Sequence, residues 1–297
     1  MTTLAPLLRQ ALDRREPAIL VTVARAQGST PREEGATMLV TRRASHGTIG
    51  GGQLEFHAID VAREMMAVHD RERRLDLPLG PHLGQCCGGR VELVLSRADA
   101  QALGRLVEVE RRIEMAKPRV LLFGAGHVGL ALARALAPLP LHVTLIDDRE
   151  AEPPALPSGV SFERVDDPEA LVEGAPEGSA FLILTHSHAL DYRLAAAALA
   201  RADAGYVGMI GSATKRSRFE RWFLQRGGRP EALRRFVCPI GGKATLDKRP
   251  EVIAALATAE ILAHLLTSPG TKFAARGRKN AARSQVREEL GRSIRAA

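Results

Sequence analysis

Three glycines and a following acidic pair have the spacing of a phosphate-binding turn. Gly124, Gly126 and Gly129 come after an apolar run, and Asp147 and Asp148 lie about twenty residues beyond them. In such a unit the first glycine permits a tight turn, the second lets backbone N–H groups approach a phosphate, and the third lets helix and strand pack closely. The helix N-terminus attracts the anion, and the acid meets a ribose hydroxyl. This spacing predicts a Rossmann unit with a phosphate-bearing ligand.

A second glycine-rich segment, GTIGGGQLE, runs directly into a helical stretch. Its three consecutive glycines, Gly50, Gly51 and Gly52, favour contact with an anionic ligand over a merely flexible turn. Two interpretations remain open for Glu55. It either accepts hydrogen bonds from the amino or amide groups of a bound heterocycle, or is a first-turn acid that the helix dipole stabilises.

Two adjacent cysteines, Cys86 and Cys87, lie in the glycine-flanked loop GQCCGG. They cannot easily both ligate one tetrahedral zinc ion, and no second Cys or His pair has metal-finger spacing, so structural zinc is not expected. A thiolate held by glycine N–H groups would have a lowered pKa and could take up sulfur or bind a soft metal. The alternative is that both are small buried apolar side chains. The loop context favours a functional role.

Further polar side chains follow two apolar runs in the second half of the chain. His186, His188 and Asp191 come after a predicted strand, where open α/β sheets bind ligands. They could form a metal site or a catalytic dyad, or simply cap a helix. Lys215 and Arg216 could pair with a phosphate or carboxylate, or begin a solvated helix. The chain contains no Gly-x-Ser-x-Gly, Walker or His-Glu-x-x-His motif, and no residue is assigned to catalysis.

Hydrophobic periodicity predicts the elements that position these residues. The fold class is α/β, with an N-terminal α/β domain over residues 1–117, a Rossmann-like doubly wound parallel-sheet domain over 118–268, and a basic flexible tail over 269–297. The predicted strands are 18–26, 36–41, 90–96, 119–123, one that ends at Asp147-Asp148, 180–185 and 205–211. The predicted helices are 4–15, 54–69, 98–115, an Ala/Leu-rich helix after the glycine turn, one through Arg201, 219–226 and 249–266.

Composition narrows the class of protein. No apolar run approaches the length of a transmembrane helix, and the start lacks the apolar core of a signal peptide, so we expect a cytoplasmic protein without a membrane partner. Three cysteines agree with a reducing compartment. The net charge is +8, but residues 271–297 hold eight basic and two acidic residues, so the rest is nearly neutral. With only 4% aromatic residues, nucleic acid is not an expected partner.

Seven motifs together resemble a known family. They are, in chain order, GSTPREEGATMLV, GTIGGGQLE, LGQCCGG, FGAGHVG, THSHALDY, YVGMIGSATKR and CPIGG. Between residue 17 and about residue 266 the chain resembles the xanthine dehydrogenase accessory proteins of the XdhC/CoxF type. The resemblance implies a molybdenum cofactor chaperone. Such a protein binds molybdopterin carrying molybdenum, keeps or helps form its sulfurated version, and delivers it to a xanthine dehydrogenase-type molybdoenzyme. The segment after CPIGG departs from the family's usual form, which leaves the role of that loop open.

The resemblance also implies a cysteine desulfurase as a partner that supplies sulfur, and a homodimer is a further expectation. We expect an accessory protein rather than an enzyme. An NAD(P)-dependent oxidoreductase, suggested by the glycine turn and Asp147, is the alternative. Cys86 and Cys87 are the candidates for contact with molybdenum. The predicted cofactor-binding residues are Gly50, Gly51, Gly52, Glu55, Cys86, Cys87, Gly124, Gly126, Gly129, Asp147 and Lys215.

Overall fold

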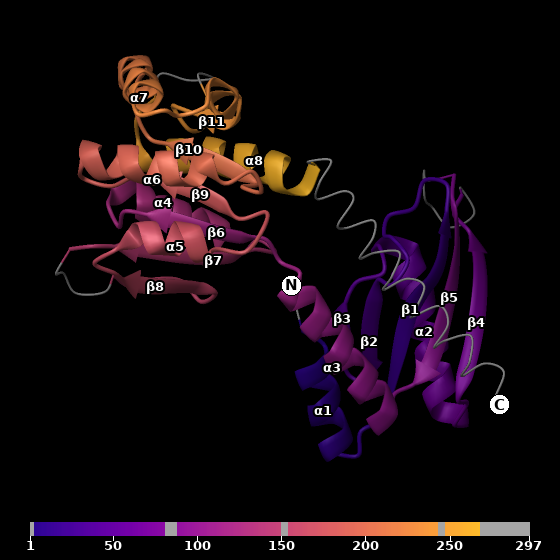
Figure 1. Ribbon diagram of the computed structural model, residues 1–297. Coiled ribbons are helices and arrows are strands. Elements are labelled where there is room, and N and C mark those ends of the chain that lie inside the picture. The colour runs from indigo at the N-terminus through magenta and orange to yellow at the C-terminus, as the bar shows by residue number, and fades with distance from the viewer. Residues whose placement is uncertain (1–2, 81–87, 150–153, 243–246, 268–297) are drawn as a thin grey trace. The chain divides into compact units, whose positions relative to one another are not determined.

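The computed structural model describes residues 3–80, 88–149, 154–242 and 247–267. The chain forms two compact units, Met1–Ala116 and Lys117–Ala297 (Figure 1). Each unit has its own apolar core. None of the helices in the described ranges combines the length and apolar character needed to cross a bilayer.

The first unit contains a five-stranded antiparallel sheet with strand order β3-β2-β1-β5-β4. Helix α2 covers one face of this sheet, and helices α1 and α3 pack over the other (Figure 1). Its elements are α1 (Ala5–Asp13), β1 (Ala18–Gln27), β2 (Thr37–Thr41), β3 (Ser45–Gly47), α2 (Gly52–Val68), β4 (Glu72–Pro78), β5 (Arg90–Arg97) and α3 (Ala100–Met115).

Side chains along the strands of this sheet alternate between the two faces, so that the buried ones pack against the helices. In β5 every second residue is buried, and Val91, Leu93 and Leu95 point into the core that α2 closes. The predicted strands and helices of this unit occur, with ends that differ by a few residues. Strand β3 corrects the prediction of a simple turn at RRASHG, because Thr41 accepts hydrogen bonds from Arg43 and Ala44 and folds the chain back onto β2.

The second unit is a Rossmann-like fold, as the sequence predicts. Six parallel strands have the order β11-β10-β9-β6-β7-β8, so the order reverses between β6 and β9. The strands are β6 (Arg119–Phe123), β7 (His142–Asp147), β8 (Val160–Arg164), β9 (Ala180–Ile183), β10 (Tyr206–Met209) and β11 (Phe236–Val237).

Helices cover both faces of this sheet, and its central strands β6, β9 and β10 are accordingly buried along their whole length except at Arg119. Helices α4 and α8 pack on one face, and α5, α6 and α7 pack on the other (Figure 1). The helices are α4 (His127–Leu136), α5 (Pro168–Gly174), α6 (His188–Ala200), α7 (Ala213–Gln225) and α8 (Pro250–Thr267), with a 3₁₀ helix at Pro230–Arg235.

Helix α7 begins earlier than the sequence predicts. The prediction started it near Phe219, but the Ser212 side chain accepts a hydrogen bond from the Lys215 backbone N–H and caps a helix that starts at Ala213. Lys215 and Arg216 therefore lie in the first turn. Strand β8 and helix α5 were not predicted from the sequence, because the prolines after β7 interrupt the hydrophobic pattern.

Candidate functional site

The carboxyl ends of β6 and β9 meet where the strand order reverses, and this edge of the sheet is where open α/β folds bind ligands. Two of the glycines that follow β6 have no room for a side chain. A Cβ atom on Gly124 would lie 2.3 Å from the Leu184 carbonyl oxygen, and one on Gly129 would lie 2.0 Å from the Gly124 carbonyl oxygen. These two glycines are therefore required by the fold itself.

Gly126 is different, because nothing in the fold restricts it. It is the N-cap of α4 with an ordinary negative φ of −77°, and an added Cβ would meet no atom within 4 Å. The space in front of the α4 N-terminus is therefore open at this residue. Backbone N–H groups of the first helical turn lack partners within the helix, so an anion can be bound there.

Asp147 does not present a free carboxylate to this space. Its Oδ1 accepts hydrogen bonds from Arg149 N (3.0 Å) and Nε (2.8 Å), and its Oδ2 accepts from Ala125 N (2.6 Å) and Arg149 Nη2 (2.8 Å). Burial acts to raise the pKa of Asp147, but these hydrogen bonds outweigh it and lower the pKa to about 2. With two donors on each oxygen, the carboxylate has no acceptor position left for a ribose hydroxyl in this conformation.

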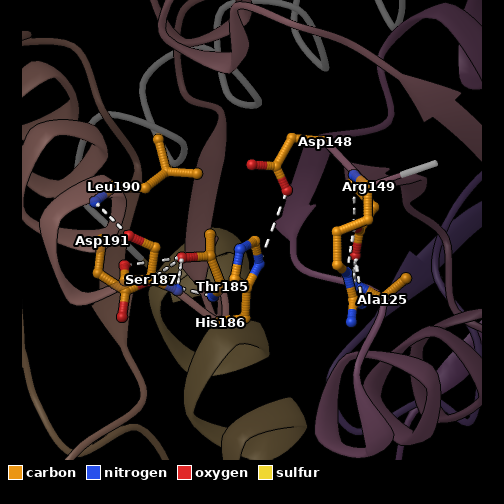
Figure 2. Close-up of polar contacts among 9 residues, drawn as sticks. Ala125, Asp148, Arg149, Thr185, His186, Ser187, Leu190 and Asp191 are labelled. Atoms are coloured by element: carbon orange, nitrogen blue, oxygen red, sulfur yellow. Dashed lines mark hydrogen bonds and ion pairs between the residues drawn. The ribbon is translucent and has the colours of Figure 1, made fainter.

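The neighbouring carboxylate, Asp148, faces His186 instead. The distance between Asp148 Oδ1 and His186 Nδ1 is 3.8 Å, and both side chains are partly exposed (Figure 2). The pair links the segments that follow β7 and β9, on either side of β6. Among the described residues, no three His, Cys, Asp or Glu side chains are grouped closely enough to hold a metal ion.

Asp191 and Lys215 form a buried ion pair. Asp191 is fully buried, and its Oδ2 accepts a hydrogen bond from Lys215 Nζ at 2.5 Å. Its Oδ1 accepts from the backbone N–H (3.0 Å) and the hydroxyl (2.8 Å) of Thr185, while Lys215 Nζ also donates to the Ile210 carbonyl (3.0 Å). The pair thus joins the loop after β9, helix α6, the end of β10 and helix α7.

Beside this ion pair lies a cavity of about 350 Å³ at the amino ends of α6 and α7. Among the described residues, no carboxylate lines this cavity, and its wall includes two basic residues, a histidine and three residues that carry hydroxyl groups. Sequence reasoning singled out His188 and Lys215 but missed the others, although SATKR after an apolar strand was the available signal. The lining residues are His188, Tyr192, Ile210, Gly211, Ser212, Thr214, Lys215 and Arg218.

The three histidine and aspartate candidates after β9 therefore do not act together. His186 faces Asp148, His188 lines the cavity as the first residue of α6, and Asp191 is buried against Lys215. The reason is local, because the Ser187 side chain caps α6 and the helix then directs successive residues to different faces.

In the first unit, the glycine-rich loop surrounds the chain's own carboxylate. The backbone N–H groups of Ile49 (2.9 Å), Gly50 (3.2 Å) and Gly51 (2.9 Å) all donate to Glu55 Oε1. The Thr48 hydroxyl donates to the same oxygen. Burial tends to raise the pKa of Glu55, yet these hydrogen bonds lower it overall. Positive φ angles at Gly50, Gly51 and Gly52 explain the three consecutive glycines.

Cys86 and Cys87 lie outside the described residues. The third cysteine, Cys238, is buried and belongs to the CPIGG loop, and burial raises the pKa of its thiol to about 11. Later in this loop, Gly241 N donates to Glu260 Oε2 (2.9 Å), and Tyr206 donates to Glu260 Oε1 (2.9 Å). The loop is thereby attached to α8 and to β10.

Two family models match the chain. The model described as the XdhC Rossmann domain matches residues 120–261, and that of the XdhC and CoxI family matches residues 11–76. Together they cover more than two thirds of the chain. One model matches the second compact unit and the other matches the first, so the likeness extends well beyond the glycine turn.

Two individual proteins are similar to this chain. The protein named "Uncharacterized protein YqeB" of Escherichia coli K12 is 28% identical over 262 residues, which are 86% of this chain and 44% of YqeB. The chain thus spans less than half the length of that relative. A crystal structure described as a xanthine dehydrogenase from Bacillus halodurans superposes with a TM-score of 0.72 and 17% identity, covering 91% of this chain and 99% of the other. This second likeness establishes a shared fold.

Proposed function

From the fact that the chain belongs to the XdhC family, we propose that it takes part in the maturation of a xanthine dehydrogenase-type molybdenum enzyme. Its role in that process would be to bind the molybdenum cofactor and pass it to the enzyme. The cofactor consists of molybdopterin carrying molybdenum, and its phosphate and hydrogen-bonding pterin ring call for an anion site beside an open surface.

The observation that carries this proposal is the open edge of the Rossmann-like sheet. Gly126 leaves the N-terminus of α4 accessible, and the acid-free cavity lies at the amino ends of α6 and α7. These residues fit a phosphate-bearing group, because both places offer hydrogen-bond donors and, in the described part of the chain, neither is lined by a carboxylate that lacks a partner. When bound, the cofactor would supply the molybdenum chemistry, and this chain would hold and orient it.

Asp147 favours the carrier over the nicotinamide alternative. A ribose hydroxyl needs a free acceptor at the end of the second Rossmann strand. Here both oxygens of Asp147 are occupied by Ala125 and Arg149. An NAD-dependent oxidoreductase would have to open this cluster before its carboxylate could bind the ribose, whereas a pterin carrier has no such requirement.

We include three further elements in the proposal. The chain would hold the cofactor while it is sulfurated, with a cysteine desulfurase as the sulfur donor and Cys86 and Cys87 as contacts to molybdenum. It would work in the cytoplasm, in keeping with its three cysteines. Exchange of the cofactor between partners would be compatible with a homodimer.

Cofactor loading tests the proposal directly. The full chain is equilibrated anaerobically with molybdenum cofactor released from a molybdenum hydroxylase, separated by gel filtration, and measured for molybdenum and for pterin fluorescence after oxidation. We expect both to co-elute with the protein and then to activate a cofactor-free xanthine dehydrogenase-type enzyme. Absence of both from the protein fraction would refute the carrier role, and tight NAD(H) binding by calorimetry would support the oxidoreductase instead.

A further inference from the structure

We propose that the cavity between α6 and α7 is a phosphate-monoester site in which Arg218 is the residue that recognises the anion. The inference deepens the proposed function, on which it rests, by placing the phosphate end of the ligand at α7 rather than at the glycine turn before α4. The cavity volume of about 350 Å³ lies within the range of small-molecule sites.

Charge distribution selects Arg218 among the basic residues. The ammonium of Lys215 is already paired with buried Asp191 at 2.5 Å and also bonded to the Ile210 carbonyl. Arg218 lies one turn beyond Thr214 on α7, is exposed, and has no carboxylate beside it among the described residues of the cavity wall. Among the described residues of the wall, its guanidinium is therefore the cation that remains to bind an anion, and its planar donors match two phosphate oxygens.

The remaining wall completes a phosphate-monoester site rather than a site for a bare ion. Thr214 contributes a hydroxyl from the first turn of α7, and His188 contributes an imidazole from the start of α6. Tyr192 supplies an aromatic surface, and its ring is held against Phe219 (5.4 Å between centroids) and Trp222 (5.5 Å). The phosphate would meet Arg218 and Thr214, and the organic part of the ester would lie along Tyr192.

The buried ion pair gives the cavity a fixed shape. Lys215 is anchored to Asp191 on α6 and to Ile210 after β10, so the two helix ends that bound the cavity cannot separate without breaking these contacts. Lys215 is thus a positioning residue for this site, whereas Arg218 would contact the ligand.

Trp222 provides the measurement, because it is the single tryptophan of the chain and its ring packs on Tyr192. The full-length protein is titrated with glycerol 3-phosphate, inorganic phosphate and glycerol, with calorimetry as a second readout. The test variant is Arg218→Gln. The control is Arg221→Gln, an exposed arginine on the same helix that donates to the Ser217 carbonyl and does not line the cavity.

Glycerol 3-phosphate should bind saturably to the wild type and to Arg221→Gln, and at least about tenfold more weakly to Arg218→Gln. Tighter binding of the ester than of inorganic phosphate would support a monoester site. Equal binding of the two, no saturable binding, or equal losses in both variants would overturn the proposal.

Molybdenum retention by the same variants separates this inference from the proposed function. If the wild type and Arg218→Gln retain the cofactor equally well, the phosphate placement is wrong and the carrier role stands. If glycerol 3-phosphate binding depends on Arg218 but the wild type retains no cofactor, the cavity site stands and the carrier role is wrong.

Discussion

The Asp147 carboxylate, at the end of β7, accepts a hydrogen bond 2.6 Å long from the backbone N–H of Ala125 inside the glycine turn. The two residues belong to different strand–turn segments of the Rossmann-like sheet. The acid that commonly binds a ribose in Rossmann folds here holds the glycine turn in place. Its second partner, Arg149, covers the same carboxylate, so Asp147 is buried although the Arg149 side chain is about half exposed.

Replacing Asp147 with asparagine should lower stability in a pH-dependent manner. The folded-state pKa of about 2 lies below the ordinary value of 3.8, so ionised Asp147 stabilises the fold above pH 3.8 and this contribution is lost as the pH falls towards 2. Because Arg149 is about half exposed, we expect a cost of about 1–2 kcal/mol at pH 7.

Urea unfolding followed by Trp222 fluorescence measures this cost, with Asp148→Asn as the control. The difference between Asp147→Asn and wild type should shrink below pH 3.8. A difference that stays constant down to pH 2 would show that the ionised carboxylate does not stabilise the turn.

Alanine at two of the turn glycines should separate folding from ligand approach. Gly129→Ala places a Cβ 2.0 Å from the Gly124 carbonyl oxygen and should destabilise the protein by about 3 kcal/mol or more. Gly126→Ala meets no atom within 4 Å, so its stability should change by less than about 1 kcal/mol.

Both glycine variants are measured by urea unfolding and by cofactor loading. Gly126→Ala should remain folded but retain less molybdenum, because the added methyl group occupies the space in front of α4. Unaltered retention in this variant would argue that no ligand group approaches the α4 N-terminus.

The loop around Glu55 should lose protection when its carboxylate is removed. In Glu55→Ala the backbone N–H groups of Ile49, Gly50 and Gly51 lose their shared acceptor, at a cost of about 1–3 kcal/mol. Their amide hydrogens should exchange faster, as measured by NMR. Glu64→Ala, on the same helix and largely exposed, is the matched control.

The pH dependence of the Glu55 effect also has a definite sign. The folded-state pKa of Glu55 is lowered from 4.5, so its stabilisation is present above pH 4.5 and is lost below it. Amide protection in the wild type should therefore fall towards that of the variant in acid. Protection that is equal in wild type and Glu55→Ala at pH 7 would contradict the observed hydrogen bonds.

Breaking the buried ion pair should be costly, whereas breaking an exposed one should not. Lys215→Met leaves Asp191 buried without its counter-charge and should destabilise the protein by about 3–5 kcal/mol. The control is Arg193→Met, because Arg193 lies on the same helix as Asp191 but forms an exposed ion pair with Glu169. Its stability should remain close to that of the wild type.

A double variant measures the coupling between the two charges. Lys215→Met combined with Asp191→Asn should be less destabilised than the sum of the single variants, because neither charge is then left unpaired. Unfolding followed by Trp222 fluorescence provides the free energies. Strict additivity would show that the two side chains do not interact.

The thiols should differ sharply in reactivity. Cys238 is buried, and the pKa of its thiol is raised to about 11. Only a very small fraction of this thiol is therefore ionised to the reactive thiolate near neutral pH. In the variant Cys86→Ala/Cys87→Ala, the remaining thiol should react with Ellman's reagent only after denaturation. Rapid reaction of the folded variant would show that the CPIGG loop opens.

The same variant tests the adjacent cysteines in cofactor loading. If Cys86 and Cys87 contact molybdenum, Cys86→Ala/Cys87→Ala should retain less of it than wild type. Cys238→Ala, which removes the buried thiol, is the control and should retain the metal if it folds. Equal retention in all three proteins would remove the adjacent cysteines from the site.

Much of the second unit was predictable, because its signals are local. An apolar run before Gly124, a helix after it and an acid after the next strand follow from the order of residues and from chain geometry. The connection after β7 was not predictable, because its prolines interrupt the hydrophobic periodicity. Strand β8 forms there because it pairs with β7, which the local sequence does not reveal. The early start of α7 depended on a cap at Ser212 that the prediction overlooked.

The sequence by itself determined the family, the Rossmann-like class and the glycines that only close backbone packing can explain. These features depend on residue type and on separation along the chain. Only the tertiary structure decided what each polar side chain faces. It assigned Asp147 to Ala125 and Arg149, Glu55 to its own loop, and Asp191 to Lys215. The physical reason is that a buried carboxylate must find donors, and its donors here come from whichever segments the fold brings within hydrogen-bonding distance.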